Sequence, residues 1–220
     1  MLIILGLLTL ILVRSVSPFD VRALCPEVCP SRLYPSTAQG TWWTIQATNT
    51  SNVECGILNT HCPWKCLGFQ FYSNVYPRLY IHEYNMTAFG YNTTKGCYDH
   101  QYAIIRLVDM NQPWAVFNIA DKWTGVYTIV AILDTDDHES FIILYVCGVK
   151  TAEGEPIVFI ITRDKRGMCR RNEKRVDAVL KANNIRRCNL NVIDRNKCPV
   201  KFSTMFAIET CCNTNLDNVK

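Results

Sequence analysis

Apolar and polar residues alternate with the period of β-strands from residue 41 to residue 163. Short segments rich in Ile, Val, Tyr, Phe and Trp are separated by turn residues, the pattern of strands joined by short connections. These segments are 41–48, 66–73, 77–85, 101–108, 113–120, 126–133, 140–149 and 156–163. Because no long helical pattern interrupts them, they predict a meander of neighbouring antiparallel strands.

Two of the segments, 126–133 and 140–149, are apolar on both faces. In the second, one face carries Phe141, Ile143 and Tyr145 and the other carries Ile142, Leu144 and Val146. A strand that is apolar on both faces must be covered on both. The lumen of a barrel covers one face, and a further element has to cover the other.

A helical pattern at about 172–184 supplies that cover. Asn172 favours an N-cap, and Asn183-Asn184 favours a C-terminal stop. Val176, Val179 and Leu180 follow the i, i+3, i+4 spacing of a single apolar stripe. The expected fold is therefore all-β, an eight-stranded antiparallel up-and-down β-barrel with one C-terminal α-helix packed on the outside. Residues 190–194 predict a short ninth strand.

Length and composition fit one domain with a sizeable core, with 220 residues of which 49% are hydrophobic. The net charge of +4 is too small to indicate nucleic acid or an anionic membrane surface as a partner. The apolar run 1–13 is too short to span a bilayer and is followed by small residues, which predicts a signal peptide over 1–15, cleaved after Ser15. The barrel would occupy 16–198, and 199–220 a C-terminal extension tied by a disulfide and able to form an edge strand over 199–209.

Cysteine usage agrees with secretion and an extracellular location. The twelve cysteines are an even number and indicate a disulfide framework. They are Cys25, Cys29, Cys55, Cys62, Cys66, Cys97, Cys147, Cys169, Cys188, Cys198, Cys211 and Cys212. N-glycosylation acceptor triplets begin at Asn49, Asn85 and Asn92.

Three motifs lie in order on the predicted elements. Gly40-Thr41-Trp42-Trp43 opens the first strand, the run from Asp134-Thr135-Asp136 to Tyr145-Val146-Cys147 joins the sixth and seventh, and Arg163 ends the eighth. Over about 25–198 the chain resembles the lipocalins, particularly the apolipoprotein D and insect bilin-binding branch. In the second motif Asp137 stands where that family usually has a tyrosine.

The resemblance implies a barrel with an apolar cup that holds one small ligand. It implies that Trp42 packs against Arg163 at the closed end, both being structural residues. It also implies two disulfides, Cys66–Cys198 and Cys147 with either Cys25 or Cys29. The pairing of the other cysteines stays open.

Aromatic residues on the predicted strands are the candidates for lining the cup, because aromatic surfaces suit elongated or flat apolar ligands. They are Phe69, Phe71, Tyr80, Tyr102, Trp114, Phe117, Tyr127, Phe141 and Tyr145. The expected function is a secreted, non-enzymatic carrier of a small hydrophobic molecule. Bilins, carotenoids, retinoids, fatty acids, sterols and other lipids remain open as ligands, no cofactor is required, and the oligomeric state is open.

Two other functions remain as alternatives, an extracellular interaction protein with a filled barrel and a thiol-dependent isomerase using Cys55 or Cys62. The cluster of Cys55, His61, Cys62 and Cys66 has the residue types of a metal site, but secretion favours disulfides and no metal is expected. The basic stretch from Arg163 to Arg175 is interpreted as a solvated loop rather than a glycosaminoglycan site.

Overall fold

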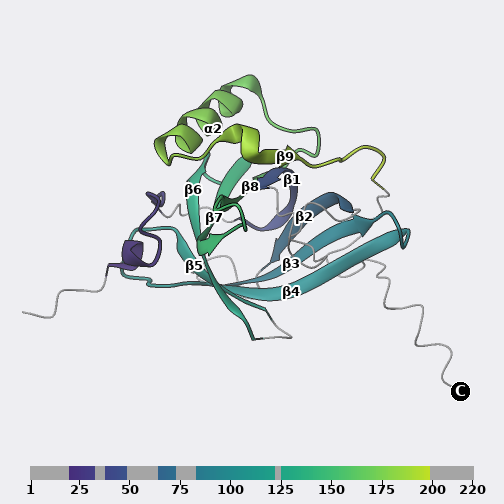
Figure 1. Cartoon of the computed structure of the whole chain (residues 1–220). Helices are drawn as coiled ribbons and strands as arrows, with labels where there is room; N and C mark the ends of the chain where they lie inside the picture. Colours follow the sequence, from purple (N-terminus) through teal and green to yellow (C-terminus); the bar gives the residue numbers. More distant parts are fainter. Residues whose placement is uncertain (1–19, 33–37, 49–63, 73–82, 122–124, 199–220) are drawn as a thin grey trace, which may run out of the picture.

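The structure of the chain, a computed structural model, describes residues 20–32, 38–48, 64–72, 83–121 and 125–198. Eight antiparallel strands close into a barrel, and a ninth short strand lies at its side (Figure 1). The barrel strands are β1 Gly40–Thr48, β2 Trp64–Tyr72, β3 Glu83–Asn92, β4 Cys97–Leu107, β5 Val116–Asp121, β6 Tyr127–Thr135, β7 Phe141–Lys150 and β8 Pro156–Thr162. The predicted fold class is confirmed.

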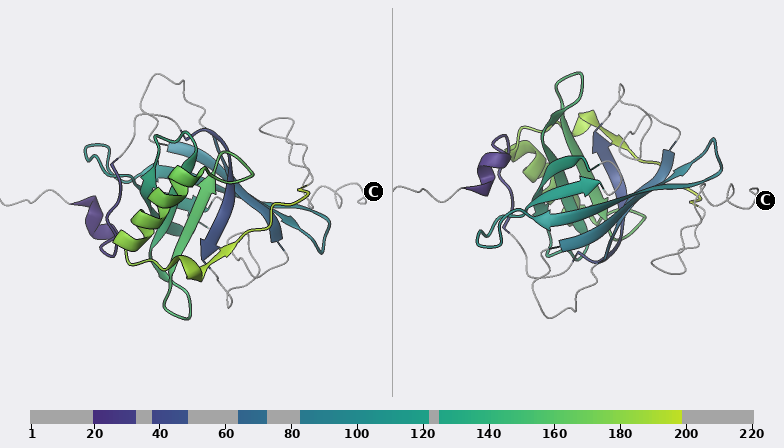
Figure 2. Two further views of the ribbon diagram at one scale, coloured as in Figure 1. Left: turned by 90° about the horizontal axis from the view of Figure 1, so that it is seen from above. Right: turned by 90° about the horizontal axis from the view of Figure 1, so that it is seen from below.

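Strand β1 closes the barrel and divides one of its edges between two partners. Along one edge it pairs with β8, from Trp43 opposite Thr162 to Ala47 opposite Phe159. Along the other edge its first half pairs with β2 and its second half pairs with β9, Leu190–Val192. The segment that follows the helix therefore lies beside β1, where β2 has separated from it (Figure 2).

Helix α2, Arg170–Ala182, lies outside the barrel over β6, β7 and β8 (Figures 1 and 2). Its stripe packs as expected, because Val176 and Leu180 are fully buried against the outward-facing side chains of those strands. The helix starts and ends two residues before the predicted range. Its N-cap is Cys169. Asn172 was the wrong N-cap: it lies inside the first turn, and its side-chain amide bonds Ser140 of the barrel instead.

Strands β3 and β4 are longer than predicted and form a hairpin that projects from the body of the barrel (Figure 2). The segments 77–85 and 101–108 miss residues 86–92 and 97–100, while 77–82 lies outside the described residues. The hairpin packs closely on β2 at Gly90, where a Cβ would lie 2.5 Å from Cδ2 of Leu67 and 2.9 Å from Cε3 of Trp64.

The N-terminal lead, residues 20–32, is fastened to the barrel wall at two places. A short 3₁₀ turn, η1 Val21–Leu24, is followed by a disulfide from Cys25 to Cys147 on β7. The backbone of Ser31 then accepts a hydrogen bond from the Ala115 N–H and donates one to the Ile132 carbonyl. The lead is thereby hydrogen-bonded to the chain where β5 and β6 begin to pair. The lead is therefore part of the barrel.

The second disulfide, Cys66–Cys198, ties the end of the described chain to β2. These are the two bridges that the lipocalin resemblance implies, with Cys25 chosen over Cys29. Cys97 is also disulfide-bonded. The expected signal peptide, 1–15, and the tail, 199–220, fall outside the described residues. Among the described helices, none has the length and apolar character needed to cross a bilayer.

Candidate functional site

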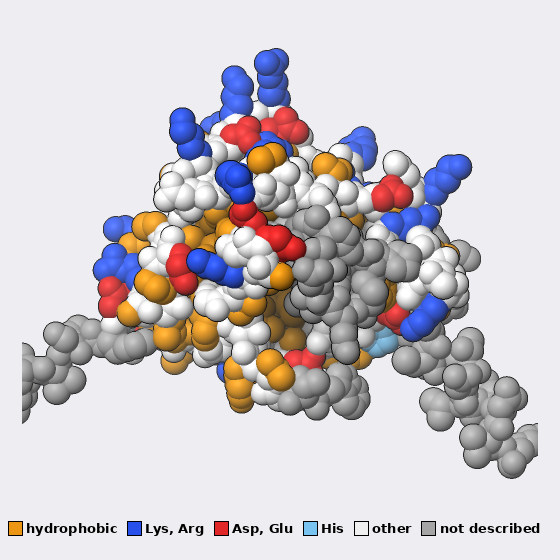
Figure 3. Space-filling view, in the orientation of Figure 1, with side chains coloured by type: hydrophobic (Ala, Val, Ile, Leu, Met, Phe, Trp, Pro, Cys, Tyr) orange, Lys and Arg blue, Asp and Glu red, His pale blue; other side chains and the backbone are white. Residues whose placement is uncertain are grey.

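The inside of the barrel is a continuous apolar surface built from one face of each strand. Its largest side chains are Phe69 and Phe71 of β2, Phe117 of β5 and Phe159 of β8, all at most 9% exposed. Phe69 stacks parallel to Phe71 at 6.2 Å between ring centroids and meets the edge of Phe159 at 5.8 Å. Small residues on the same cluster, Ala47, Ala88, Ala103 and Ala115, add little volume. Hydrophobic side chains are visible in a hollow of the face shown in Figure 3.

One end of this interior is sealed by Trp42. The indole is fully buried, its Nε1 donates to the Ala38 carbonyl at 2.7 Å, and the Arg163 guanidinium lies over the ring at 4.0 Å. Arg163 also donates to the Gln39 carbonyl. Gly40 has φ +103°, and a methyl group there would lie 2.6 Å from Nη1 of Arg163. These contacts give Gly40, Trp42 and Arg163 a structural part at this end.

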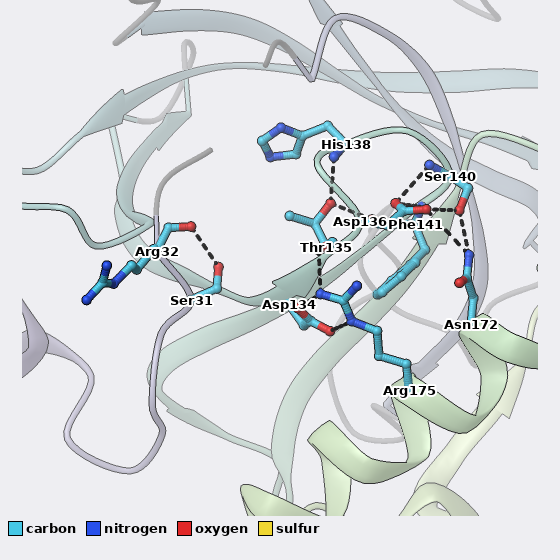
Figure 4. A network of polar contacts seen from close by, with 10 residues as sticks. All are labelled: Ser31, Arg32, Asp134, Thr135, Asp136, His138, Ser140, Phe141, Asn172 and Arg175. Atoms are coloured by element: carbon cyan, nitrogen blue, oxygen red, sulfur yellow. Dashed lines mark hydrogen bonds and ion pairs between the residues drawn. The ribbon is translucent and has the colours of Figure 1, made fainter. Parts of the chain in front are cut away.

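A polar network fixes α2 to the same end of the barrel (Figure 4). Arg175 donates from Nε and Nη2 to the two carboxylate oxygens of Asp134, each at 2.6 Å, and from Nη2 to the Thr135 carbonyl at 2.9 Å. Asp136 accepts from the backbone N–H groups of Ser140 and Phe141. Burial raises the pKa of Asp136, but these hydrogen bonds and that from the Ser140 hydroxyl outweigh it and hold the pKa below its usual value. The Asp134–Asp136 motif is thus a docking point for the helix.

Replacing Arg175 with Met is expected to lower the free energy of unfolding by about 2 kcal/mol, because it leaves the mostly buried Asp134 carboxylate without its bidentate partner. Chemical denaturation monitored by circular dichroism measures the loss. Lys174→Met, at the exposed neighbouring position, is the matched control and should change stability by less than about 0.5 kcal/mol. Equal losses in both variants would contradict the role of Arg175.

The opposite end of the interior carries polar groups that the sequence did not reveal. A β-bulge between Lys65 and Gly68, with Cys66 at φ +57°, changes which face of β2 points inward. Trp64 therefore packs against the interior cluster, opposite Asn92 of β3. Its indole Nε1 is buried and reaches no hydrogen-bond acceptor among the described residues. A buried donor without a partner costs free energy unless a ligand or water satisfies it.

Two further polar side chains lie at the same end of the interior as Trp64. Gln101 donates from Nε2 to the Asp121 carboxylate at 2.5 Å. Strand alternation puts Gln101 on the same face of β4 as Ala103, an interior residue, and Ala103 is directly opposite Asp121. The interior is therefore apolar at the end closed by Trp42 and carries amide, carboxylate and indole groups at the other end.

Of the predicted cup residues that the structure describes, only the phenylalanines at 69, 71 and 117 face the interior. Phe141 and Tyr145 were wrong, since they lie on the outer face of β7 beneath α2, and Ile142, Leu144 and Val146 point inward. Trp114 was also wrong, because it packs outside with Arg22 over its ring. Tyr102 meets the His100 ring on the outward face of β4, and Tyr127 is 72% exposed. Tyr80 lies outside the described residues. These errors arose because the cup residues were predicted from their aromatic character and not from the face of the strand on which each one lies.

The other predicted sites are placed as follows. Of the predicted glycosylation sites, Asn85 lies within β3 and Asn92 is its last residue. The Oδ1 of Asn92 accepts hydrogen bonds from the backbone N–H groups of Thr94 and Lys95. Asn49 lies outside the described residues. Cys55 and Cys62 also lie outside the described residues. The free thiols among the described residues, Cys29, Cys169 and Cys188, are exposed and do not belong to the interior cluster. The described residues hold no cluster of potential metal ligands.

Solved structures with the same architecture have low sequence identity to this chain. Lobster apocrustacyanin A1 is 16% identical, with a TM-score of 0.52 over 71% of this chain and 77% of that one. Insecticyanin from the tobacco hornworm Manduca sexta is 13% identical, with a TM-score of 0.54 over 76% and 86%. The chain has the fold of a lipocalin.

A third structure of this fold is the cockroach allergen Per a 4, which is 12% identical, with a TM-score of 0.53 over 76% of this chain and 94% of that one. Neither protein-family models nor curated proteins match the sequence. At these identities the likeness extends to the lipocalin fold, and the function must be argued from the interior of this barrel.

Proposed function

We propose that the chain is a secreted carrier that binds one small hydrophobic molecule inside the barrel. The observation that carries the proposal is an interior that is apolar from Trp42 upward and has at its other end the buried indole N–H of Trp64, for which the described residues supply no acceptor. Such an arrangement suits a molecule that is mostly apolar and has one oxygen at its end. A pigment such as a bilin, carotenoid or retinoid, or a lipid with a carboxyl, hydroxyl or carbonyl group, has this character.

In this proposal the apolar part of the ligand lies among Phe69, Phe71 and Phe159, and its terminal oxygen accepts from Trp64. Burial of apolar ligand surface provides most of the affinity, at about 25 cal/mol per Å² before entropic costs. The Gln101–Asp121 pair lies at the same end and adds a donor and an acceptor. No covalent chemistry is required of the protein.

Two measurements on protein purified from its source test the proposal directly. Native mass spectrometry would show a mass increment for a bound molecule, and an absorbance spectrum would name the class of a co-purified chromophore. A barrel that never carries a molecule, and that binds none of biliverdin, retinol or oleic acid in titrations, would contradict carriage and favour the interaction protein with a filled barrel.

Replacing Trp64 with Phe is expected to weaken binding of an oxygen-bearing ligand by about 3- to 10-fold, because the ring still packs while the donor is lost. Titration of retinol or oleic acid, followed by quenching of tryptophan fluorescence, measures the change. Trp114→Phe is the matched control, since Trp114 lies outside the barrel and its replacement should leave affinity unchanged. Equal affinity in wild type and Trp64→Phe would exclude the indole as a ligand contact.

A further inference from the structure

A second hollow lies outside the barrel. It has a volume of about 670 Å³ and is formed by the connection from β8 to α2 and by the segment that follows β9. The residues that line it are Lys165, Arg166, Val192, Ile193, Asp194, Arg195 and Asn196. Lys165 also lies over the ring of Trp43, with Nζ at 5.7 Å from the ring centroid, which places the hollow against the outer face of β1. This hollow is distinct from the barrel interior.

The backbone that forms one wall is held at several points. Ile193 donates to the Ile45 carbonyl at 3.0 Å, and Asp194 accepts from the Cys66 N–H at 2.7 Å. The Ile193 side chain is 5% exposed and packs with the barrel core, while Cys198 is disulfide-bonded to Cys66. The segment from 193 to 198 is therefore fixed to both β1 and β2, and Arg195 is presented from a rigid support.

Positive charge predominates at this hollow. The Nε and Nη1 atoms of Arg195 are buried and have no hydrogen-bond partner in the part of the chain that the structure describes. Arg166 pairs with Asp164 but its side chain is 90% exposed and extends into solvent. Asp194 is the acidic residue of the lining, and its Oδ1 accepts from the Asn196 backbone at 2.9 Å. Burial lowers the pKa of Arg195, an effect that Asp194 partly offsets, yet a guanidinium remains protonated at neutral pH.

Three cations, Lys165, Arg166 and Arg195, line this hollow with a single carboxylate. The group that best satisfies the N–H donors of such clustered cations is an oxyanion. We propose that this hollow binds the phosphate or sulfate group of a small organic anion, with Arg195 as the principal contact and Lys165 as a second cation. Since a single water occupies about 30 Å³ of liquid, the hollow has room for an organic part beside the oxyanion. The exposed side chain of Val192 offers that part an apolar contact.

The test measures anion binding to the full chain with its disulfides intact. Phenyl phosphate and phenyl sulfate are titrated at constant ionic strength by calorimetry, with phenol as the neutral analogue and inorganic phosphate and sulfate as the bare ions. The charged compounds should bind and phenol should not. Arg195→Gln should weaken binding at least tenfold, and Arg195→Lys should recover part of it. The relative affinity of the two phenyl esters tells phosphate from sulfate.

Arg106→Gln is the matched control, because Arg106 is an exposed arginine paired with Glu83 on the β3–β4 hairpin. It should bind the anions as wild type does. Lys165→Gln supplies a second test that does not depend on folding of the Arg195 variants, with an expected loss of about threefold or more. Backbone amide NMR shifts on titration should concentrate at 165–166 and 192–196. Equal affinity in wild type, Arg195→Gln and Lys165→Gln, or shifts spread over the surface, would overturn the proposal.

Discussion

Replacing Trp42 with Ala is expected to lower the free energy of unfolding by about 4 kcal/mol. The indole is fully buried, so its removal leaves a cavity at the sealed end of the barrel. It also removes the hydrogen bond to Ala38 and the ring on which the Arg163 guanidinium lies at 4.0 Å. That cation would remain in a partly buried place without its aromatic partner.

Denaturant unfolding followed by circular dichroism measures this loss, with Trp114→Ala as the control. Trp114 is half-buried on the outside of the barrel, so its loss should cost clearly less, about 1–2 kcal/mol. If both variants lost the same stability, Trp42 would have no special part in closing the barrel. Trp42→Phe should fall between wild type and Trp42→Ala, since it keeps most of the ring volume.

Removing the Cys66–Cys198 bridge by the double replacement with Ser is expected to cost about 4 kcal/mol. The bridge closes a loop with a sequence separation of 132, and constraints on long loops reduce the entropy of the unfolded chain most. It also holds the segment after β9, so the backbone hydrogen bonds of Ile193 with Ile45 and of Asp194 with Cys66 should loosen with it. Unfolding under non-reducing conditions gives the stability change, and amide hydrogen exchange at 190–198 gives the local one.

The control for the bridge is Cys188→Ser. Cys188 lies in the same C-terminal segment but is exposed and free, so its replacement should be neutral within about 0.5 kcal/mol. A double Ser variant with wild-type stability and unchanged exchange at 190–198 would show that hydrogen bonding to β1 and β2 alone holds this segment.

Much of the architecture could be predicted because it is written in local periodicity. Alternation along the strands indicated the barrel, and the apolar stripe through Val176 and Leu180 indicated the covering helix. Boundaries were less predictable where side chains outside the element decide them. Asn172 has the chemistry of an N-cap, but Ser140 of the barrel takes its amide, and the helix begins at Arg170.

The candidate site was predicted only in part, for a reason visible at two positions. Alternation separates Phe141 and Tyr145 from Ile142 and Leu144 but does not say which set faces inward. The helix decides it, by covering the first set. On β2 the bulge at Cys66 changes which alternate residues face inward, and Trp64 therefore packs against the interior. No local pattern marks that change.

The sequence by itself therefore determined a disulfide-linked barrel with one helix, and its resemblance to the lipocalins implied the packing of Trp42 with Arg163. Of the nine aromatic residues it offered for the cup, three phenylalanines face the interior. Only the tertiary structure decided which side chains line that interior, and only it brought Arg195 beside Lys165 from segments far apart in the chain. Periodicity is a property of neighbouring residues, whereas the facing of a strand and the partner of a buried polar group depend on contacts between distant ones.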